Sequence, residues 1–268
     1  MERSWKFAAC AAAVLLFAAG GASAQEHARM IGGKPNLNGI WQVMNGANWN
    51  LEPHDGQEAP VAPEKLGAIG AIPQGLGVVE GGKIPYLPDA LQQRDMNKQS
   101  APVKDPEAAC YLPGIPRATY MQHAFQIIQS PGDDILMAYE YDTANRVVYM
   151  KKAEEPPIDT WMGTSYGQWD GPTLTVTTLG QNGMTWLDRA GNYLTNTAKV
   201  TEHFTMKDAD HIAYDATIED PSVYSRPWKI SMMLYRHVEP NAQLLEFNCV
   251  PFADQLVYGD LQLKKDAK

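Results

Sequence analysis

The stretch Cys110-Tyr-Leu-Pro-Gly-Ile-Pro-Arg117 divides the sequence into two parts of different character. The chain before it is rich in proline and glycine and has little hydrophobic periodicity. The chain after it carries one strand-like segment after another almost to the C-terminus. The stretch itself combines a cysteine, three turn-forming residues and an arginine, which favours a segment of fixed geometry. We interpret it as the boundary between irregular arms and a β-sheet.

Strand-like segments dominate the chain after this boundary. Apolar and polar residues alternate between turn signals, as is typical of half-buried strands. The expected strands cover residues 125–130, 135–141, 174–179, 199–205, 211–218, 228–238 and 244–250. Turn residues predict hairpin loops at 142–145, 207–209 and 239–242. Consecutive short hairpins at this spacing predict an all-β fold, an antiparallel meander that closes as a lipocalin-like barrel or a strongly curled sheet.

The chain from residue 53 to residue 106 shows no sustained helical or strand period. Proline removes backbone donors and glycine adds an entropy cost, so regular structure is disfavoured there. Helical spacing appears only over 88–97, where Pro88 can start a short helix. We expect residues 25–109 to form a first strand and arms that wrap the sheet or cover one end of it. Residues 110–262 would form the barrel part of the same single domain.

The first 24 residues have the pattern of a secretory signal peptide. Arg3 and Lys6 form a basic region, residues 7–19 are apolar, and residues 22–24 form a small-residue cleavage site. The apolar run is too short to span a bilayer, and no later stretch approaches the roughly 18 apolar residues that a spanning helix needs. We expect an exported protein, periplasmic or secreted, without membrane insertion.

The formal net charge of the chain is −9, and loss of the leader would remove two basic residues and one acidic residue. The mature chain would therefore carry a charge near −10. Nucleic acid and anionic membrane surfaces attract basic patches, so this charge argues against both as partners. Solubility alone accounts for an acidic surface of this kind.

Two cysteines, Cys110 and Cys249, lie outside the leader. In an oxidising compartment such a pair often forms a disulfide, and this one would close a loop of about 140 residues, worth about 4 kcal/mol. The alternative is two buried thiols that never meet. A hairpin at 239–242 would set Cys249 opposite Met232, so the bond would pin the start of the sheet to its last long strand. It would also aim Arg117 into the barrel.

A carboxylate interrupts an apolar face in the expected strand 199–205. Alternation puts Glu202 on the same face as Val200 and Phe204, and hairpin pairing sets it across from Tyr214. Burial of a carboxylate is costly unless it is paired, and such surroundings are typical of a general acid or base. The alternative is a salt bridge from Glu202 that only fixes the sheet.

Two arginines are candidates for that salt bridge. Arg236 shares the inward face of strand 228–238, and Arg146 lies across from Tyr141 if the loop 142–145 sets the register. Tyr139 lies in the same strand as Tyr141. We therefore place Arg146, Arg236 and the two tyrosines among the candidate ligand-binding residues.

Further candidates lie in loops. The stretch 182–192 holds Trp186 and Asp188, which would offer an aromatic wall and a carboxylate at a barrel rim. Alternatively, Asp188 caps a turn. Trp161 is expected either as a core plug or as a pocket wall.

The histidines form no HxH or HExxH spacing, and neither cysteine has a CxxC partner, so we expect no metal site. His54 and His123 flank the irregular half and would reach the same barrel end, although each also fits a structural role. No phosphate-binding loop, dinucleotide fingerprint or Gly-x-Ser-x-Gly elbow is present, and we expect no cofactor.

Two resemblances add to this interpretation. Gly39-Ile-Trp41 is similar to the Gly-x-Trp of lipocalin-like barrels, in which the tryptophan closes one end of the barrel. The chain as a whole resembles a group of exported bacterial proteins of unassigned function that share a series of motifs. These motifs are Cys110–Arg117, Asp159-Thr-Trp-Met-Gly163, residues 167–176, Met184-Thr-Trp-Leu-Asp188 and Ile218-Glu-Asp-Pro221. The resemblance covers most of the mature chain and implies a shared fold and leader, but no activity.

Three functions are compatible with these features. The first is an exported β-barrel that binds a small aromatic or amphipathic molecule. The second is a cofactor-independent lyase, isomerase or hydrolase with Glu202 as general acid or base. Tyr214 and Arg117 or Arg146 would then stabilise negative charge, and Asp188 would supply a second carboxylate. The third is an accessory protein whose arms dock onto another exported protein. Sequence patterns predict no oligomeric state.

Overall fold

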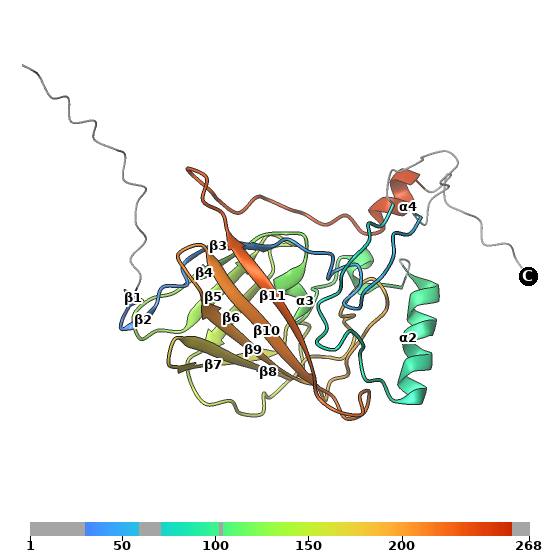
Figure 1. The fold of residues 1–268 in the computed structure, drawn as a ribbon, viewed down its shortest axis with the longest axis horizontal. Coiled ribbons are helices and arrows are strands. Elements are labelled where there is room, and N and C mark those ends of the chain that lie inside the picture. The colour runs from blue at the N-terminus through green and yellow to red at the C-terminus, as the bar shows by residue number, and fades with distance from the viewer. Residues whose placement is uncertain (1–29, 59–70, 102–103, 259–268) are drawn as a thin grey trace, which may run out of the picture.

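The structure, a computed structural model, describes residues 30–58, 71–101 and 104–258. The expected signal peptide and its cleavage site lie outside the described residues. Nine strands form a closed barrel in the order β10-β11-β3-β4-β5-β6-β7-β8-β9 (Figure 1), which confirms the expected all-β barrel. The strands are β3 (Gly39–Val43), β4 (Phe125–Ile128), β5 (Ile135–Tyr139), β6 (Asn145–Tyr149), β7 (Thr164–Asp170), β8 (Thr173–Leu179), β9 (Lys199–Met206), β10 (His211–Glu219) and β11 (Trp228–Arg236).

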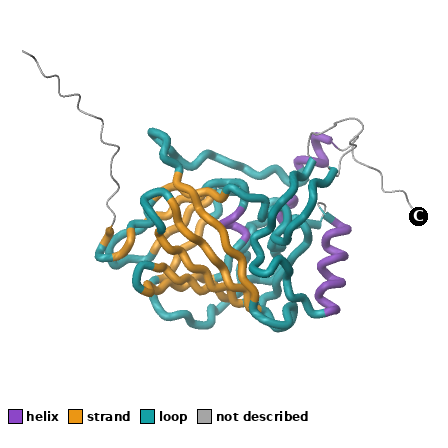
Figure 2. Tube along the Cα trace, viewed as in Figure 1, coloured by secondary structure: helices purple, strands orange, loops and turns teal. Residues whose placement is uncertain are grey.

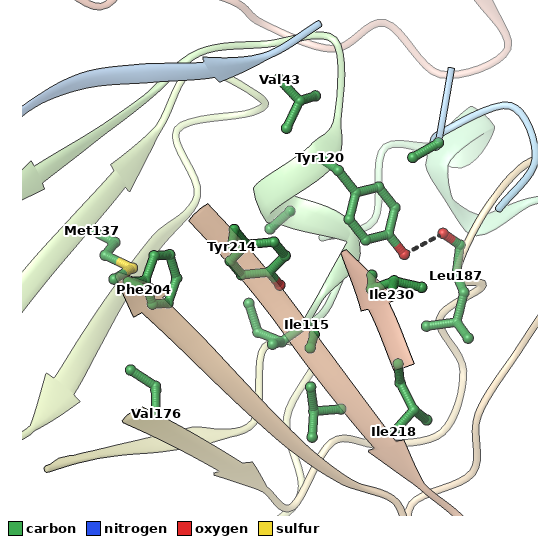
Figure 3. Close-up of a cluster of buried hydrophobic side chains, with 14 of the residues drawn as sticks. Val43, Ile115, Tyr120, Met137, Val176, Leu187, Phe204, Tyr214, Ile218 and Ile230 are labelled. Carbon is green, nitrogen blue, oxygen red and sulfur yellow. Dashed lines mark hydrogen bonds between the residues drawn. The ribbon is translucent and has the colours of Figure 1, made fainter. Parts of the chain in front are cut away.

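The barrel interior is a packed core of side chains. Every second residue is buried from Val200 to Phe204 in β9 and throughout β10, because alternate side chains of a strand point to opposite faces. Figure 3 shows part of this core, which includes Phe204, Tyr214 and Ile230 from the strands together with Ile115 and Tyr120. All five of these side chains have at most 1% of their surface exposed. Small barrels commonly fill their interiors in this way.

The strands β6 and β7 depart from the expected meander. They run parallel, and their register consists of Val148 opposite Ser165 and Tyr149 opposite Tyr166. A parallel pair needs a long connection, which residues 150–163 supply. In the part of the chain that the structure describes, the other neighbouring barrel strands pair antiparallel. The prediction of a continuous antiparallel meander is therefore wrong at this joint.

The β5–β6 hairpin turns earlier than its sequence indicates. Asp142 and Thr143, with φ of 48° and 50°, form the turn in place of Asn145. The amide of Tyr139 donates to the carbonyl of Ala144 at 2.9 Å, so the strands already pair beside this two-residue turn. A turn with two positive φ angles matches the twist of the flanking strands. Tyr141 consequently leaves the strand, and its expected pairing with Arg146 is wrong.

The β9–β10 hairpin keeps the expected faces but shifts its register. Glu202 lies opposite Ala216, not opposite Tyr214. The loop begins one residue later than expected, since the amide of Lys207 still donates to the carbonyl of His211 at 2.9 Å. Moving the turn by one residue changes each partner by two positions, which leaves the inward face unchanged. Glu202 and Tyr214 are therefore diagonal neighbours inside the barrel.

The last expected strand, 244–250, is absent from the described strands. Only Phe247 forms a single bridge, with Tyr141. The strand β11 instead pairs with β3, which closes the barrel between the beginning and the end of the chain. Cys249 therefore does not lie opposite Met232, and the hairpin expected at 239–242 is wrong.

The helices and most of the loops gather on one side of the strands (Figure 2). The expected helix at 88–97 is α2 (Pro88–Ser100), which begins at Pro88 after an extended Leu87. The remaining described helical segments are η1 (Pro106–Ala109), α3 (Arg117–Tyr120) and α4 (Ala253–Tyr258). A two-stranded ribbon of β1 (Met30–Ile31) and β2 (Lys34–Pro35) lies away from them (Figure 1). No helix among the described residues has the length and apolarity that crossing a membrane requires.

The arm before α2 lies along the barrel wall. The strand β11 pairs with β3 only at its C-terminal end, from Leu234 to Arg236. Val79 bridges Ile230 near the other end of β11, and the amide of Ser231 donates to the carbonyl of Val78 at 3.0 Å. The arm thus supplies backbone partners to the part of β11 that β3 does not reach.

The stretch that follows Cys110 enters the barrel end as a plug. The backbone of Ile115 donates to the side-chain oxygen of Gln181 at 2.7 Å and accepts from its amide nitrogen at 2.8 Å. Gly114 has φ of +71°, and a Cβ there would lie 2.8 Å from the same Gln181 oxygen. Glycine is the residue that tolerates both this φ and this close approach. The plug then continues into α3, whose Tyr120 donates to the carbonyl of Leu187 (Figure 3).

Candidate functional site

A buried ion pair lies inside the barrel. Arg146 of β6 and Glu202 of β9 both point inward, and Glu202 is 0% exposed. The Nη2 atom of Arg146 donates to Oε2 of Glu202, and Nη1 donates to Oε1 at 3.3 Å. Burial lowers the pKa of Arg146, but the adjacent charge of Glu202 outweighs burial and raises it above its usual value. Of the two expected salt-bridge partners of Glu202, the structure pairs it with Arg146.

Hydroxyl groups complete the surroundings of this pair. Tyr214 donates to Oε1 of Glu202 at 3.0 Å, and Thr119 of the plug helix donates to the same oxygen at 3.4 Å. Arg146 donates through Nε to Ser165 at 2.8 Å and through Nη2 to Thr178 at 3.4 Å. Burial, together with the charge of Glu202, raises the pKa of Tyr214 well above its usual value, so this phenol remains a donor. Both oxygens of Glu202 are therefore occupied.

A cavity of about 530 Å³ lies where β6 and β7 separate. The two strands pair only at Val148 and Tyr149 of β6, and the chain diverges before these positions. The cavity is lined by Leu112, by residues 142–147 with Tyr149, and by residues 160–164. Asn145, Val147 and Tyr149 face outward, whereas Arg146 faces the barrel interior. Arg146 thus connects the external cavity with the buried ion pair.

Trp161 forms one wall of this cavity. Its ring stacks on Tyr111 with 4.6 Å between ring centres and 11° between ring planes. Its loop is fixed at the preceding residue, because the amide of Thr160 donates to the carbonyl of Gly180 and the carbonyl of Thr160 accepts from the amide of Asn182. Tyr111 follows the disulfide cysteine directly and is 51% exposed. The pocket-wall alternative for Trp161 agrees with this geometry.

The sequence predicts that Arg117 points freely into the barrel. In the structure, its guanidinium is instead hydrogen-bonded to neighbouring side chains at the barrel end. Its guanidinium donates to Asp105 at 2.9 Å through both Nη atoms, to Asn48 at 2.8 Å and to Glu107. Arg189 donates to both carboxylate oxygens of Glu107, to Oε1 at 2.6 Å and to Oε2 at 2.9 Å. We call these five residues the end cluster. Burial raises the pKa of Glu107, but the two arginines outweigh it and lower the pKa to about 2.

The expected disulfide between Cys110 and Cys249 is confirmed. It holds the C-terminal segment beside the end cluster, where Tyr141 donates to the carbonyl of Glu107 at 3.0 Å. Phe247 of this segment lies 4.2 Å from the ring of His123, and burial lowers the pKa of that histidine. Tyr141 and His123 are therefore covered by the C-terminal segment and do not line the cavity.

Asp188 caps a turn, as the alternative interpretation of the sequence predicts. One oxygen accepts from the amides of Ala190 and Asn192, and the other accepts from the amide of Leu51 and the side chain of Asn192. Burial nevertheless raises the pKa of Asp188 to about 6. The nearby Trp186 is buried, and its carbonyl accepts from Arg117 at 3.4 Å. Neither residue lines the cavity.

The remaining candidates lie outside the cavity. Arg236 covers the ring of Trp41 at 4.2 Å and does not reach Glu202, which corrects the second expected salt bridge. Tyr139 is buried against Phe125 at 5.4 Å between ring centres, and its hydroxyl lies beside Arg146 and Thr119 at the buried ion pair. His54 makes a contact of 3.2 Å to the carbonyl of its neighbour Glu52, and its Nε2 atom is buried without a partner. None of these three candidates lines the cavity.

The sequence argument did not identify several residues that bind the buried charges or line the cavity. Thr178 alternates with the buried Leu174 and Val176 in β8, so the reasoning that found Glu202 could also have found Thr178. Asp105 and Glu107 lie in the aperiodic arm, where no pattern marks an inward side chain. Tyr149 and Asn145 line the cavity because two distant strands diverge, and no local signal carries that information.

Among the described residues, no group of three or more histidine, cysteine or acidic side chains could hold a metal ion. Comparison with protein-family models, with curated proteins and with solved structures found no match. The fold and the site therefore define this protein as a closed nine-stranded β-barrel with a buried ion pair and an external cavity in its wall.

Proposed function

We propose that this protein is an exported barrel that binds a small aromatic or amphipathic molecule in the cavity between β6 and β7. The observation that carries the proposal is the cavity itself, at about 530 Å³. Small-molecule sites commonly have volumes of roughly 300–1,000 Å³ and combine apolar walls with a few polar groups. Here Trp161, Met162 and Leu112 supply apolar surface, while Asn145 and Thr160 supply polar groups.

The wall cavity is a better candidate than the barrel interior. The interior positions are occupied by large side chains, such as Phe204, Tyr214 and Phe125, that are almost completely inaccessible to solvent. A ligand inside the barrel would have to displace this core, and packed interiors resist such changes. A ligand in the wall cavity would displace only solvent.

Binding is also favoured over catalysis by Glu202. A general base must come within about 2.6–3.2 Å of the proton that it removes. Glu202 is 0% exposed, does not line the cavity, and holds Arg146, Tyr214 and Thr119 on its two oxygens. These contacts support a structural role for this carboxylate.

Export is supported by two independent features. The first residues have the composition of a secretory leader, with two basic residues before an apolar run. The described chain then contains a disulfide, and such bonds persist mainly in oxidising compartments such as the periplasm.

Native mass spectrometry of protein purified from its own source tests the proposal. We expect wild-type protein to retain a small molecule, Trp161→Ala to lose it, and Trp169→Ala to keep it. Trp169 is a matched control, because it is another partly buried tryptophan that lines a separate, smaller cavity. Retention by both variants, or no retained mass in the wild type together with no thermal stabilisation in a metabolite screen, would contradict the proposal.

A further inference from the structure

The cavity between β6 and β7 contains one carboxylate whose charge is not neutralised. Asp142 and Arg146 are the lining residues that carry a charge. The charge of Arg146 is balanced by Glu202 in the buried ion pair. Among the described residues, no lysine or arginine forms an ion pair with Asp142. The formal charges of the lining residues sum to zero, but the local sum becomes −1 when Glu202, the partner of Arg146, is included.

The turn fixes the position of Asp142. Its φ of 48° is left-handed, and aspartate is one of the few side chains that tolerate this region. The amide of Ala144 closes the turn by donating to the carbonyl of Tyr141 at 3.0 Å. Asp142 is a partly buried residue of the cavity wall, where its charge is screened less than it would be in open solvent.

Aromatic rings provide the second element of the site. The face of an indole attracts a cation more strongly than other side-chain rings do. The protein itself contains such a contact beside the cavity, since the Lys151 ammonium lies 5.8 Å from the ring centre of Tyr149. The same lysine forms an ion pair with Glu154. Trp161 lines the cavity while Tyr111, which does not line it, stacks on Trp161 and supports the ring. An indole ring and an unpaired carboxylate thus border the same cavity.

We propose that this cavity selects a cationic amine with an apolar or aromatic body. This inference rests on the proposed binding function and names the class of its ligand. The ammonium group would be attracted by Asp142 and by the ring of Trp161, while the body would cover Leu112 and Met162. A carboxylate ligand would be repelled by Asp142 and would find no free cation on the cavity wall, since Arg146 is paired.

Three probes with similar bodies and different charges test this inference: 2-phenylethylamine, 2-phenylethanol and 3-phenylpropionate. We expect the amine to bind about tenfold more tightly than the alcohol at low salt, as a partly buried ion pair combined with a cation–π contact would give. The carboxylate should bind more weakly than the alcohol. Binding is measured by isothermal titration with the full mature chain.

Two substitutions separate charge from fold. Asp142→Asn should remove the preference for the amine over the alcohol. The matched control, Asp170→Asn, removes an exposed carboxylate at the end of β7 and should change neither affinity. If Asp142→Asn fails to fold, the wild type still decides, because added salt should weaken binding of the amine and spare the alcohol.

The outcomes distinguish this inference from the proposed function. Equal binding of the three probes, or tighter binding of the carboxylate, overturns the amine assignment and leaves the cavity as a binding site. Absence of amine binding overturns the assignment as well. The proposed function then depends only on whether native protein retains a molecule that Trp161→Ala loses.

Discussion

Arg146 links two environments, because it lines the wall cavity and neutralises Glu202 inside the barrel. Two ions removed from water lose hydration, and their mutual attraction compensates only when the geometry and the additional hydrogen bonds are good. Here Tyr214, Ser165 and Thr178 supply those bonds. Loss of one partner should therefore lower the free energy of unfolding strongly, whereas replacement of both partners by apolar side chains should change it little.

Substitution of one partner tests this balance. Glu202→Gln should lower the free energy of unfolding by about 3–5 kcal/mol, because it leaves the charge of Arg146 buried and unpaired. The double variant Glu202→Leu with Arg146→Met should regain most of that loss. Urea denaturation followed by tryptophan fluorescence measures both. A stable Glu202→Gln protein that has lost a metabolite conversion would instead favour the catalytic role.

The end cluster predicts a loss of stability in acid. The folded-state pKa of Glu107 is about 2, against an ordinary value of 4.5, so its ionised form is favoured by folding. Its contribution is fully present above pH 4.5 and is lost as the pH falls towards 2. The difference corresponds to about 3 kcal/mol. Denaturant unfolding between pH 2 and 5 should show this slope in the wild type and in the exposed control Glu246→Gln, but not in Glu107→Gln.

Asp188 acts in the opposite sense. Burial raises its folded-state pKa to about 6 from 3.8, so folding favours its protonated form. Its contribution to stability is present at low pH and is lost as the pH rises from about 4 through 6, again by about 3 kcal/mol. The combined effect of Glu107 and Asp188 is a stability maximum near pH 4. A monotonic rise in stability from pH 2 to pH 7 would contradict this assignment.

The elements show how far sequence patterns reach. Alternation correctly placed Glu202 and Tyr214 on the inward face, and Pro88 marked the start of α2. The registers failed because they depend on turn geometry. Asp142-Thr143 forms a two-residue turn without glycine, so the usual sequence signal of such a turn is missing. The cavity could not be predicted either, because it requires β6 and β7 to pair in parallel and then diverge.

The plug predicts a contrast between two glycines. Gly114 and Gly132 have similar φ angles, +71° and +77°, but a Cβ on Gly114 would lie 2.8 Å from Gln181 and Thr185. A Cβ on Gly132 would meet nothing within 4 Å. Gly132→Ala should cost about 1–2 kcal/mol for its backbone conformation alone. Gly114→Ala should cost more, as thermal or urea unfolding will show, and equal losses would contradict the close-packed plug.

At the scale of the whole molecule, one covalent bond joins residues that are 139 positions apart. Replacement of both cysteines by serine should lower the free energy of unfolding by about 2–5 kcal/mol, because the unfolded chain gains freedom. Thiol titration of unreduced, denatured mature protein should find no free thiol. Reducing agent should destabilise the wild type and leave the double serine variant unchanged. Two titratable thiols would show that the bond does not form in the native source.

The closure of the barrel has a consequence for the time at which the chain folds. Trp41 of β3 pairs with Arg236 of β11, so the first barrel strand waits for the last one to be synthesised. Contacts between such distant residues slow folding. A ribosome-bound chain therefore cannot close its barrel before nearly all of it has been made. If the protein is exported, as we propose, delayed closure would keep the nascent chain in the open form that a secretory channel accepts.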